Sequence, residues 1–341
     1  MWFGIDWDST RYDSGILVIA SYQWNEDEPE CPENTAILSH TNLSIDNVAL
    51  MLPTALELGR SVANLVFKSQ RGEPSVILDE NQPIFPTVPA DLTDTPRISI
   101  RSLTRLQDLD NHTRVDAVCL HDHSLYFAFK HYPYLAEDEP TEDLLSELQL
   151  LLQINSPYVI KPSHLVVEET QNDIFRGFLM PYYSHGSLTD VLRRSDRKSL
   201  EWSLKEKWAF QISAGVATLH QRSYSGDLKL DNILVSDTND ICLIDVAPTQ
   251  GYTVDYIAPE FTNHQLLELT SARDIYALGI VLWAIAAEKA DFIKEEIGLW
   301  EETGVQTWYK HLVDQCLAHN PHDRPTADVV SQTCLQASRV M

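Results

Sequence analysis

The longest uninterrupted apolar segment of this 341-residue chain runs for thirteen residues, from Ile275 to Ala287. It is too short to cross a bilayer, which needs about 20 apolar residues in a helix. As a helix it would be apolar on all sides, and such a helix is stable only where other elements surround it. The segment therefore predicts a buried helix through the middle of the second half of the chain.

Acidic residues outnumber basic ones: 50 Asp and Glu against 25 Lys and Arg give a net charge of −25 and an isoelectric point near 4.7. This balance argues against nucleic acid or an anionic membrane as main partner, because phosphate binding requires clustered Lys and Arg. The five cysteines form no CxxC pair, which favours free thiols in a reducing compartment. Residues 1–13 lack the basic region and apolar core of a signal peptide. We expect a soluble intracellular protein, in the cytoplasm or nucleus, that binds neither nucleic acid nor membrane.

Residues 1–104 carry no motif that indicates a function, and we interpret them as an N-terminal extension of unknown role. The stretch SGILVIAS (14–21) predicts a strand. Residues 49–67 have helical periodicity, and the prolines between residues 74 and 96 predict an extended linker. The functional domain is therefore expected to begin near residue 105.

A strand lysine and a helix glutamate are the first candidate pair after residue 105. Residues 115–118 and 125–130 predict two strands, and 137–153 predict a helix with a stripe of leucines. Glu147 lies on or beside that apolar stripe, where a carboxylate is costly unless a cation pairs with it. Lys130, at the end of the preceding strand, is the obvious partner.

Residues 224–248, YSGDLKLDNILVSDTNDICLIDVAP, contain two short apolar runs separated by strong turn composition. If the runs pair as an antiparallel hairpin, Asn232 before the first strand lies near Asp245 after the second. An amide oxygen and a carboxylate suit a hard cation such as Mg²⁺. Asp227, five residues upstream of Asn232, is close enough to share this site.

These elements occur in a fixed order: a strand lysine, an inward-facing helix glutamate, an Asp-x4-Asn loop and an aspartate after a hairpin. In order and spacing, residues 105–341 resemble the eukaryotic protein kinase family. The matching stretches are AFK (128–130), Glu147 with Pro157 ten residues later, GFLMPYYSHGSLTDVL (177–192), DLKLDN (227–232), Asp245, YIAPE (256–260), DIYALGIVLW (274–283) and HDRPT (322–326). Each motif alone is weak, but the whole series in this order is specific.

The resemblance implies an α+β, bilobal fold, with a small β-rich lobe containing one helix (105–180) and a larger, mainly α-helical lobe (184–341). It also implies that ATP binds with Mg²⁺ and that a protein is the substrate or partner. Lys130 would contact the α- and β-phosphates, with Glu147 holding it in place. Met180 would be the gatekeeper, and Pro181, Tyr182 and Tyr183 would offer backbone groups to adenine.

The remaining roles follow from the same resemblance. Asp227 would accept or orient the proton of the substrate hydroxyl, and Lys229 would touch the transferred phosphoryl group, in a pattern that favours serine and threonine over tyrosine. Asn232 and Asp245 would hold Mg²⁺. Three residues would be structural members of the larger lobe: Glu260, Asp274 and Arg324. Arg324 is expected to pair with Glu260, and Glu260 is expected to be buried.

The chain departs from the family where a glycine-rich loop should cradle the phosphates. At family spacing this loop occupies residues 108–115, which read DLDNHTRV without a glycine. Glycines let backbone N–H groups approach phosphates closely. Asp108 and Asp110 would instead bring negative charge towards an anion, which weakens the prediction of tight ATP binding.

Two further departures concern the activation segment. Ser225-Gly226 replaces His-Arg, so a phosphate on the segment would lack its usual arginine partner, and control by phosphorylation there is not expected. Asp245-Val246-Ala247 replaces Asp-Phe-Gly, and only fifteen residues separate Asp245 from Glu260. Three polar residues of this short segment are interpreted as loop polars rather than phosphorylation sites: Thr249, Tyr252 and Thr253.

The sequence leaves three functions open. The first is an active protein serine/threonine kinase, favoured by the presence of all five polar groups of the reaction. The second is a pseudokinase that acts as a binding or scaffold module, favoured by the missing glycines and the short segment. The third is a small-molecule kinase of the aminoglycoside or choline type, whose Asp-x4-Asn and Ile-Asp motifs are similar. The motifs around Glu260, Asp274 and Arg324 favour a protein kinase over this third function.

Overall fold

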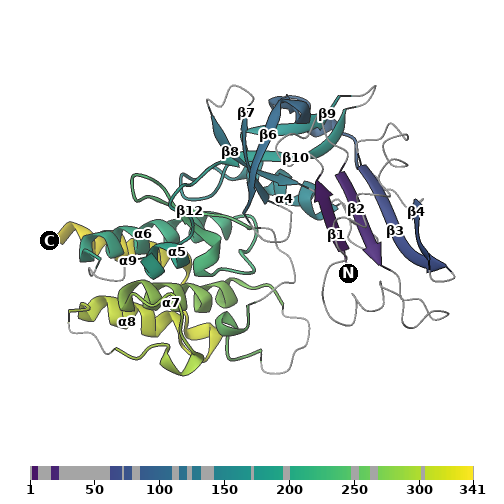
Figure 1. Ribbon diagram of the computed structural model, residues 1–341. Helices are drawn as coiled ribbons and strands as arrows, with labels where there is room; N and C mark the ends of the chain where they lie inside the picture. The colour runs from purple at the N-terminus through teal and green to yellow at the C-terminus, as the bar shows by residue number, and fades with distance from the viewer. Residues whose placement is uncertain are drawn as a thin grey trace. The chain divides into compact units, whose positions relative to one another are not determined.

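The computed structural model describes most of the chain after residue 84 and four short segments before it (Figure 1). The described residues are 2–6, 17–22, 62–70, 73–78, 85–109, 115–120, 125–131, 142–169, 173–194, 200–246, 253–261, 268–300 and 304–340. The chain divides into two compact units: Met1–Thr141 with Ser163–Met180, and Glu142–Pro162 with Pro181–Met341. Among the helices in these ranges, none has both the length and the apolar character that a bilayer crossing requires.

The first unit is built from two sheets. A four-stranded sheet has the order β1-β2-β3-β4 and a six-stranded sheet the order β5-β9-β10-β8-β7-β6. The strands of the first sheet are β1 (Trp2–Asp6), β2 (Leu17–Tyr22), β3 (Val62–Gln70) and β4 (Glu73–Leu78). Those of the second are β5 (Arg97–Ser99), β6 (Leu103–Asp108), β7 (Val115–Leu120), β8 (Tyr126–His131), β9 (His164–Glu168) and β10 (Ile174–Pro181).

The N-terminal expectations are met only in part. The strand predicted at 14–21 is present as β2. The helix predicted over 49–67 is wrong at its described end, because residues 62–70 form β3, which pairs in parallel with β2 and antiparallel to β4. The start of the predicted linker lies in β4, and β5 follows directly after the last of its prolines, Pro96, so part of this proline-containing segment pairs in a sheet.

A buried cluster covers one face of the six-stranded sheet. It contains Val118 and Phe129 from the central strands and Leu179 from β10. Ile100 and Leu103, which precede the predicted domain start, belong to the same cluster. Residues 98–103, just before the predicted domain start, therefore contribute to the core of the first unit. The predicted boundary at 104/105 falls inside β6 and stays a prediction.

Replacing Leu103 by Ala should lower the free energy of unfolding by about 2–5 kcal/mol, since a buried leucine loses its burial and leaves a cavity. Leu103 is 0% exposed, whereas Leu106 on the same strand is 47% exposed. Leu106→Ala is the matched control and should change stability by less than about 0.5 kcal/mol. Urea unfolding measures both; equal effects would show that β6 does not close this core.

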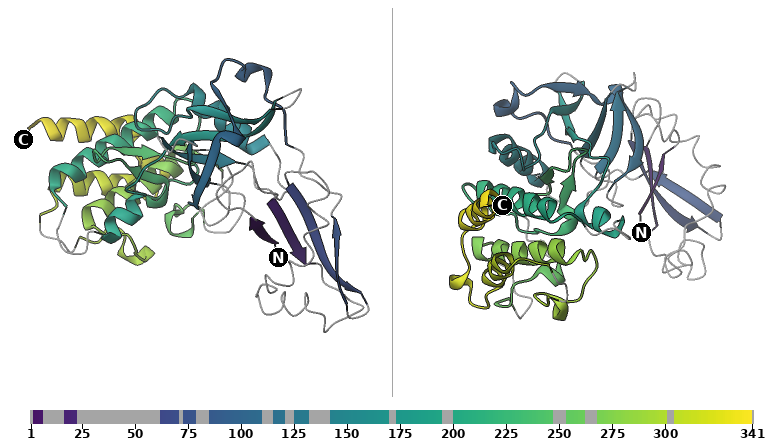
Figure 2. Two further views of the ribbon diagram at one scale, coloured as in Figure 1. Left: turned by 45° about the horizontal axis from the view of Figure 1, so that its top comes forward. Right: turned by 90° about the vertical axis from the view of Figure 1, so that its left-hand side faces the viewer.

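The second unit is mainly helical. Its helices are α4 (Glu142–Gln153), α5 (Leu188–Arg194), α6 (Trp202–Leu219), α7 (Ser271–Ala287), α8 (Thr307–Cys316) and α9 (Ala327–Val340). Within this unit α6 packs along α9, and α7 along α8 (Figures 1 and 2). With the sheets of the first unit, these helices give the predicted α+β architecture of a β-rich part and a helical part.

The apolar run identified in the sequence forms α7, as predicted. Its residues from Arg273 to Ala286 are all buried. The helix begins where the Thr270 hydroxyl accepts a hydrogen bond from the backbone N–H of Arg273, a standard N-cap. It ends at Glu288, whose left-handed backbone conformation has φ +52°. Both ends are therefore set locally, and burial sets the rest.

The predicted hairpin is also present. β11 (Ile233–Val235) pairs antiparallel with β12 (Ile241–Leu243), with Leu234 opposite Cys242. Asn239 supplies the left-handed residue of the connecting turn, with φ +57°, a conformation in which asparagine is enriched. The pattern of two apolar runs around a polar turn was sufficient to predict this element.

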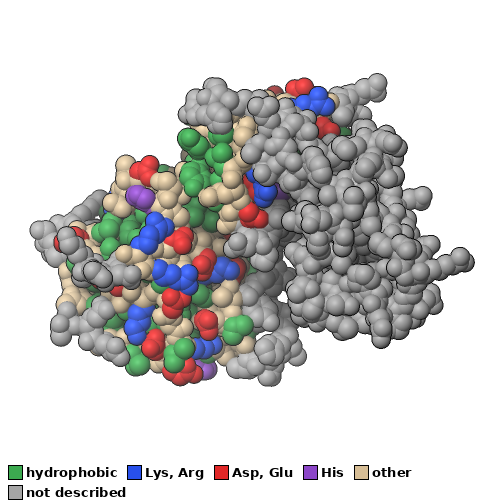
Figure 3. All heavy atoms as spheres, in the orientation of Figure 1, with side chains coloured by type: hydrophobic (Ala, Val, Ile, Leu, Met, Phe, Trp, Pro, Cys, Tyr) green, Lys and Arg blue, Asp and Glu red, His purple; other side chains and the backbone are tan. Residues whose placement is uncertain are grey.

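Charges on the second unit are mixed rather than segregated. On the face shown in Figure 3, acidic and basic side chains lie interspersed over this unit. Exposed pairs such as Arg193 with Asp291 at 2.6 Å contribute about 0–1 kcal/mol each. The apolar core therefore carries most of the stability, despite the net charge of −25.

Candidate active site

The loop that carries Asp227 is tied to the first turn of α7 by a buried carboxylate. Asp274 accepts hydrogen bonds from the backbone N–H groups of Ser225 at 2.7 Å and of Gly226 at 3.1 Å. The His220 ring lies 3.0 Å from the same carboxylate. A carboxylate that is 2% exposed requires such partners, and these bonds fix the backbone immediately before Asp227.

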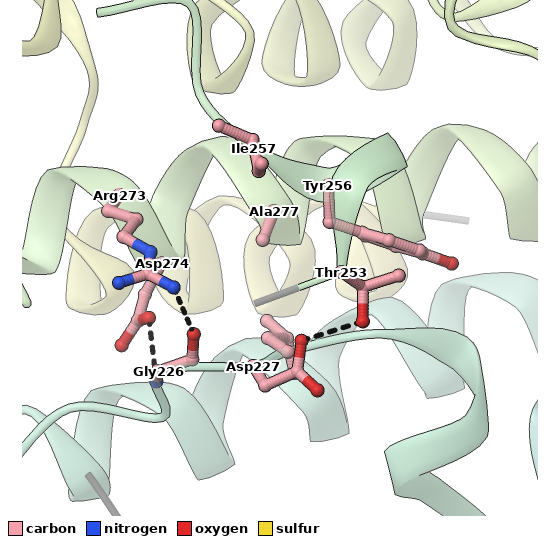
Figure 4. A pocket seen from close by; sticks show the side chains of 9 residues that line it. Gly226, Asp227, Thr253, Tyr256, Ile257, Arg273, Asp274 and Ala277 are labelled. Carbon is pink, nitrogen blue, oxygen red and sulfur yellow. Dashed lines mark hydrogen bonds between the residues drawn. The ribbon is translucent and has the colours of Figure 1, made fainter. Parts of the chain in front are cut away.

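Asp227 lies in a closed network with Lys229 and Thr253, and Figure 4 shows its bond to Thr253. Lys229 Nζ donates to Asp227 Oδ2 at 2.6 Å, and Thr253 Oγ1 donates to Asp227 Oδ1 at 2.9 Å. Lys229 Nζ also donates to Thr253 Oγ1 at 3.0 Å. Each oxygen of the carboxylate thereby accepts a hydrogen bond, one of them from a cationic side chain. This arrangement can accept the proton of, or orient, an incoming hydroxyl.

At the open end of the hairpin, a backbone hydrogen bond joins Asn232 to Ile244, the residue before Asp245. The backbone N–H of Ile244, next to Asp245, donates to the carbonyl of Asn232 at 3.0 Å. The Asn232 amide nitrogen donates to the carbonyl of Asp227 at 2.9 Å, which turns the amide oxygen away from that bond. Asp245 is exposed, with φ +55°, a conformation that aspartate tolerates better than most residues. The side chains of Asn232 and Asp245 can offer oxygen atoms as metal ligands, which fits a hard divalent cation.

The residues predicted to bind nucleotide are distributed over both units. Lys130 lies in β8 and Met180, 7% exposed, in β10 of the first unit. Glu147 lies in α4 of the second unit and is 4% exposed, so the prediction that it points inward is confirmed. The pairing of Lys130 with Glu147 stays a prediction.

The predicted hinge residues follow directly after Met180. Pro181 and Tyr182 are exposed, as backbone contacts to a ligand would require, while Tyr183 is half-buried. Burial, together with a hydrogen bond to Cys242, raises the pKa of Tyr183 well above its ordinary value. Burial likewise raises the pKa of the Cys242 thiol to about 11, which agrees with a packing role for this cysteine.

The glycine-free segment lies where the predicted loop should be. It connects β6 to β7, with Leu109 N–H donating to the carbonyl of Val115 at 2.8 Å. Asp110 lies outside the described residues. Arg105 Nη2 is 3.9 Å from Asp108 Oδ2, so a cation offsets part of the negative charge at this turn.

Arg324 and Glu260 form a bidentate ion pair. Arg324 Nη1 and Nη2 donate to the two carboxylate oxygens of Glu260 at 2.7 and 2.6 Å. The other guanidinium N–H groups donate to the carbonyls of Ala272, Ala318 and His319. All five donors of the guanidinium are thus satisfied.

The sequence predicts Glu260 as the buried partner, but Arg324 is the more buried of the two. The Arg324 side chain is 0% exposed, whereas that of Glu260 is 23% exposed. Burial alone would raise the pKa of Glu260, but hydrogen bonds from Arg324 outweigh it and hold the pKa below the ordinary carboxyl value. Breaking the pair is therefore most costly at Arg324, which would be left buried without its counter-ion.

Replacing Glu260 by Gln should destabilise the second unit by about 3 kcal/mol at pH 7, because it leaves Arg324 buried without its counter-ion. The depressed pKa means that the pair stabilises the fold above the ordinary carboxyl pKa and that this contribution disappears as pH falls through the folded-state value. The difference between wild type and Glu260→Gln should accordingly shrink at low pH. Thermal unfolding from pH 7 to pH 3 measures it.

Glu295→Gln, which alters an exposed carboxylate of the same unit, is the control for that experiment. It should leave the melting temperature within about 1 °C of wild type at each pH. A Glu260→Gln variant as stable as this control would show that the carbonyl partners alone satisfy Arg324.

Sequence reasoning missed two residues of the site. Thr253 was interpreted as a loop polar, yet its hydroxyl bridges Asp227 and Lys229. Arg273 was not singled out, yet it lies beside Asp227 in the pocket of Figure 4. The signal available for Arg273 was a cation next to Asp274 within an otherwise apolar helix. Thr249 and Tyr252 lie outside the described residues.

Comparison with known proteins was made by family model and by sequence similarity. Residues 111–335 match the model of the protein kinase domain. A probable serine/threonine-protein kinase of Dictyostelium discoideum is 26% identical over 208 residues, which cover 54% of this chain and 16% of that protein. A receptor-like cytosolic serine/threonine-protein kinase of Arabidopsis thaliana is 27% identical over 172 residues, 45% of this chain and 35% of its own length.

An inactive serine/threonine-protein kinase of Arabidopsis thaliana is also similar. It is 27% identical over 188 residues, which cover 43% of this chain and 56% of that protein. The chain thus spans less than two thirds of the length of each of these relatives.

Proposed function

The chain belongs to the protein kinase family, and we propose that it transfers the γ-phosphoryl group of ATP to serine or threonine hydroxyls of a protein, with Mg²⁺. The observation that carries the proposal is the network of Asp227, Lys229 and Thr253, in which a half-buried carboxylate is aligned by two donors. A scaffold would not need a carboxylate held in this way.

In this proposal Asp227 orients the substrate hydroxyl and takes up its proton. Lys229, whose ammonium lies 2.6 Å from Asp227, stabilises negative charge on the phosphoryl group as it is transferred. Lys229 also favours serine or threonine as acceptor, and the similar proteins described above are named as serine/threonine kinases.

Asn232 and Asp245 are proposed to hold the metal ion. Support comes from the backbone bond between Ile244 and Asn232, which joins the segments that carry the two residues at one end of the hairpin. When bound, Mg²⁺ would offset the negative charge of the phosphates. The Asn232 amide nitrogen, engaged by the carbonyl of Asp227, keeps the metal ligand and the catalytic carboxylate in one rigid loop.

The nucleotide is proposed to be bound by Lys130, with Glu147 as its counter-ion. Support comes from the burial of Glu147, because an inward carboxylate in an apolar stripe requires a cation. Met180 would line the adenine pocket, and the backbone of residues 181–183 would bind the base.

The second candidate is a pseudokinase that serves as a binding module. The observation in its favour is the β6–β7 connection, which begins with Asp108 and contains no glycine. An inactive kinase stands among the similar proteins. Arg105 beside Asp108 offsets part of the negative charge of this connection, but the connection still lacks a glycine.

Two substitutions are expected to abolish phosphotransfer while leaving the fold intact: Asp227→Asn and Lys130→Met. The first removes the proton acceptor and the second removes the phosphate contact; we expect losses of at least about 100-fold in kcat/KM. Transfer of radioactive phosphate from ATP to a generic protein substrate measures the loss.

Asp237→Asn is the matched control for these variants, since Asp237 lies in the exposed turn between β11 and β12. It should retain wild-type activity. Undiminished labelling by Asp227→Asn or Lys130→Met would remove the assigned roles. A wild type that labels hydroxylated metabolites and no protein would favour a small-molecule kinase.

A further inference from the structure

Arg273 is a buried cation that contacts the backbone of the loop carrying Asp227. It lies in the first turn of α7 and is 4% exposed. Its Nη2 donates to the backbone carbonyl of Gly226 at 2.8 Å (Figure 4). The same pocket is lined by Asp227, Thr253 and Tyr256, so Arg273 and Asp227 belong to one pocket, and Arg273 contacts the residue directly before Asp227.

The local environment of α7 does not favour a cation at this position. A charged group is costly to bury, and the N-terminal turn of a helix carries partial positive charge, which repels a cation. Burial accordingly lowers the pKa of Arg273, while the negative charges of Asp274 and Asp227 act in the opposite direction. The carbonyl of Gly226 in the loop gives this costly buried cation a hydrogen-bond acceptor.

Together, Arg273 and Asp274 hold both backbone groups of Gly226. The N–H of Gly226 donates to Asp274 Oδ1 at 3.1 Å, and its carbonyl accepts from Arg273 Nη2 at 2.8 Å. Gly226 adopts φ +78°, a conformation that glycine reaches without strain. Since the Gly226 carbonyl belongs to the peptide that links it to Asp227, rotation of that peptide would break the bond to Arg273.

We propose that Arg273 is a positioning residue, which fixes the Gly226–Asp227 peptide and so sets the orientation of the Asp227 carboxylate. This inference rests on the proposed function of Asp227. The loop has glycine at 226, where the family pattern has arginine, and here the cation comes from α7 instead. Its contact with a backbone carbonyl needs no phosphate, so the loop is ordered without modification of the activation segment.

Three variants test the proposal in the full chain: Arg273→Met, Arg273→Lys and the control Arg193→Met. Methionine approximates the length of arginine but removes the charge and the donors. Arg193 is also an arginine of the second unit, but it is exposed and pairs with Asp291. Steady-state phosphotransfer to a generic protein substrate gives kcat and the KM for ATP.

Arg273→Met should lower kcat by about 100-fold, the cost of a misplaced catalytic group, with the KM for ATP within twofold of wild type. Arg273→Lys should recover at least about tenfold of the lost kcat, and Arg193→Met should behave as wild type. A kcat for Arg273→Met within twofold of wild type, or a loss confined to KM, overturns the proposal.

Thermal unfolding without ATP separates this inference from the proposed function. Arg273→Met should lower the melting temperature by at least about 3 °C, because the Gly226 carbonyl loses its donor, whereas Arg193→Met should shift it by less than about 1 °C. Equal shifts for the two variants overturn the anchoring of the loop by Arg273. If wild-type protein transfers no phosphate, the proposed function fails, and this comparison still tests whether Arg273 holds the loop.

Discussion

The site in the second unit depends on the hydrogen bonds that the carboxylate of Asp274 accepts. This carboxylate lies at the start of a helix that is buried along its length, so it cannot be solvated by water and must be satisfied by protein donors. The donors are two consecutive backbone N–H groups of the loop that carries Asp227, and the ring of His220 lies beside them. The buried helix α7 is thereby joined to this loop, so α7 sets the position of the backbone before Asp227.

Local pattern predicted much of this arrangement. The apolar run predicted α7, the turn between two apolar runs predicted the β11–β12 hairpin, and the leucine stripe predicted the inward direction of Glu147. In each case the determinants lie within about twenty residues of one another, where periodicity and turn chemistry are informative. The resemblance to protein kinases then ordered these elements, and the match over residues 111–335 confirms it.

The failures share a physical cause: each depends on contacts between residues far apart in the sequence. Residues 62–67, the end of the segment with helical periodicity, form part of strand β3, because β2 and β4 flank it. Thr253 looks like a loop polar until folding brings its hydroxyl to Asp227, 26 residues away. Arg273 contacts Gly226, 47 residues away. Likewise, Arg324 is the more buried member of its pair with Glu260 because three backbone carbonyls also accept hydrogen bonds from it. No local sequence pattern specifies these carbonyls.

The most direct test of the central claim, that this chain binds ATP with a metal ion at Asn232 and Asp245, is thermal unfolding with ATP alone and with ATP and Mg²⁺. Wild type and Asp245→Asn are compared. A ligand at a hundred times its dissociation constant adds about 2.7 kcal/mol, so wild type should melt at a higher temperature with ATP and Mg²⁺ than with ATP alone, and Asp245→Asn should lose this metal-dependent part. No shift of the wild type at millimolar ATP and Mg²⁺ would contradict the account and leave the fold as a binding module.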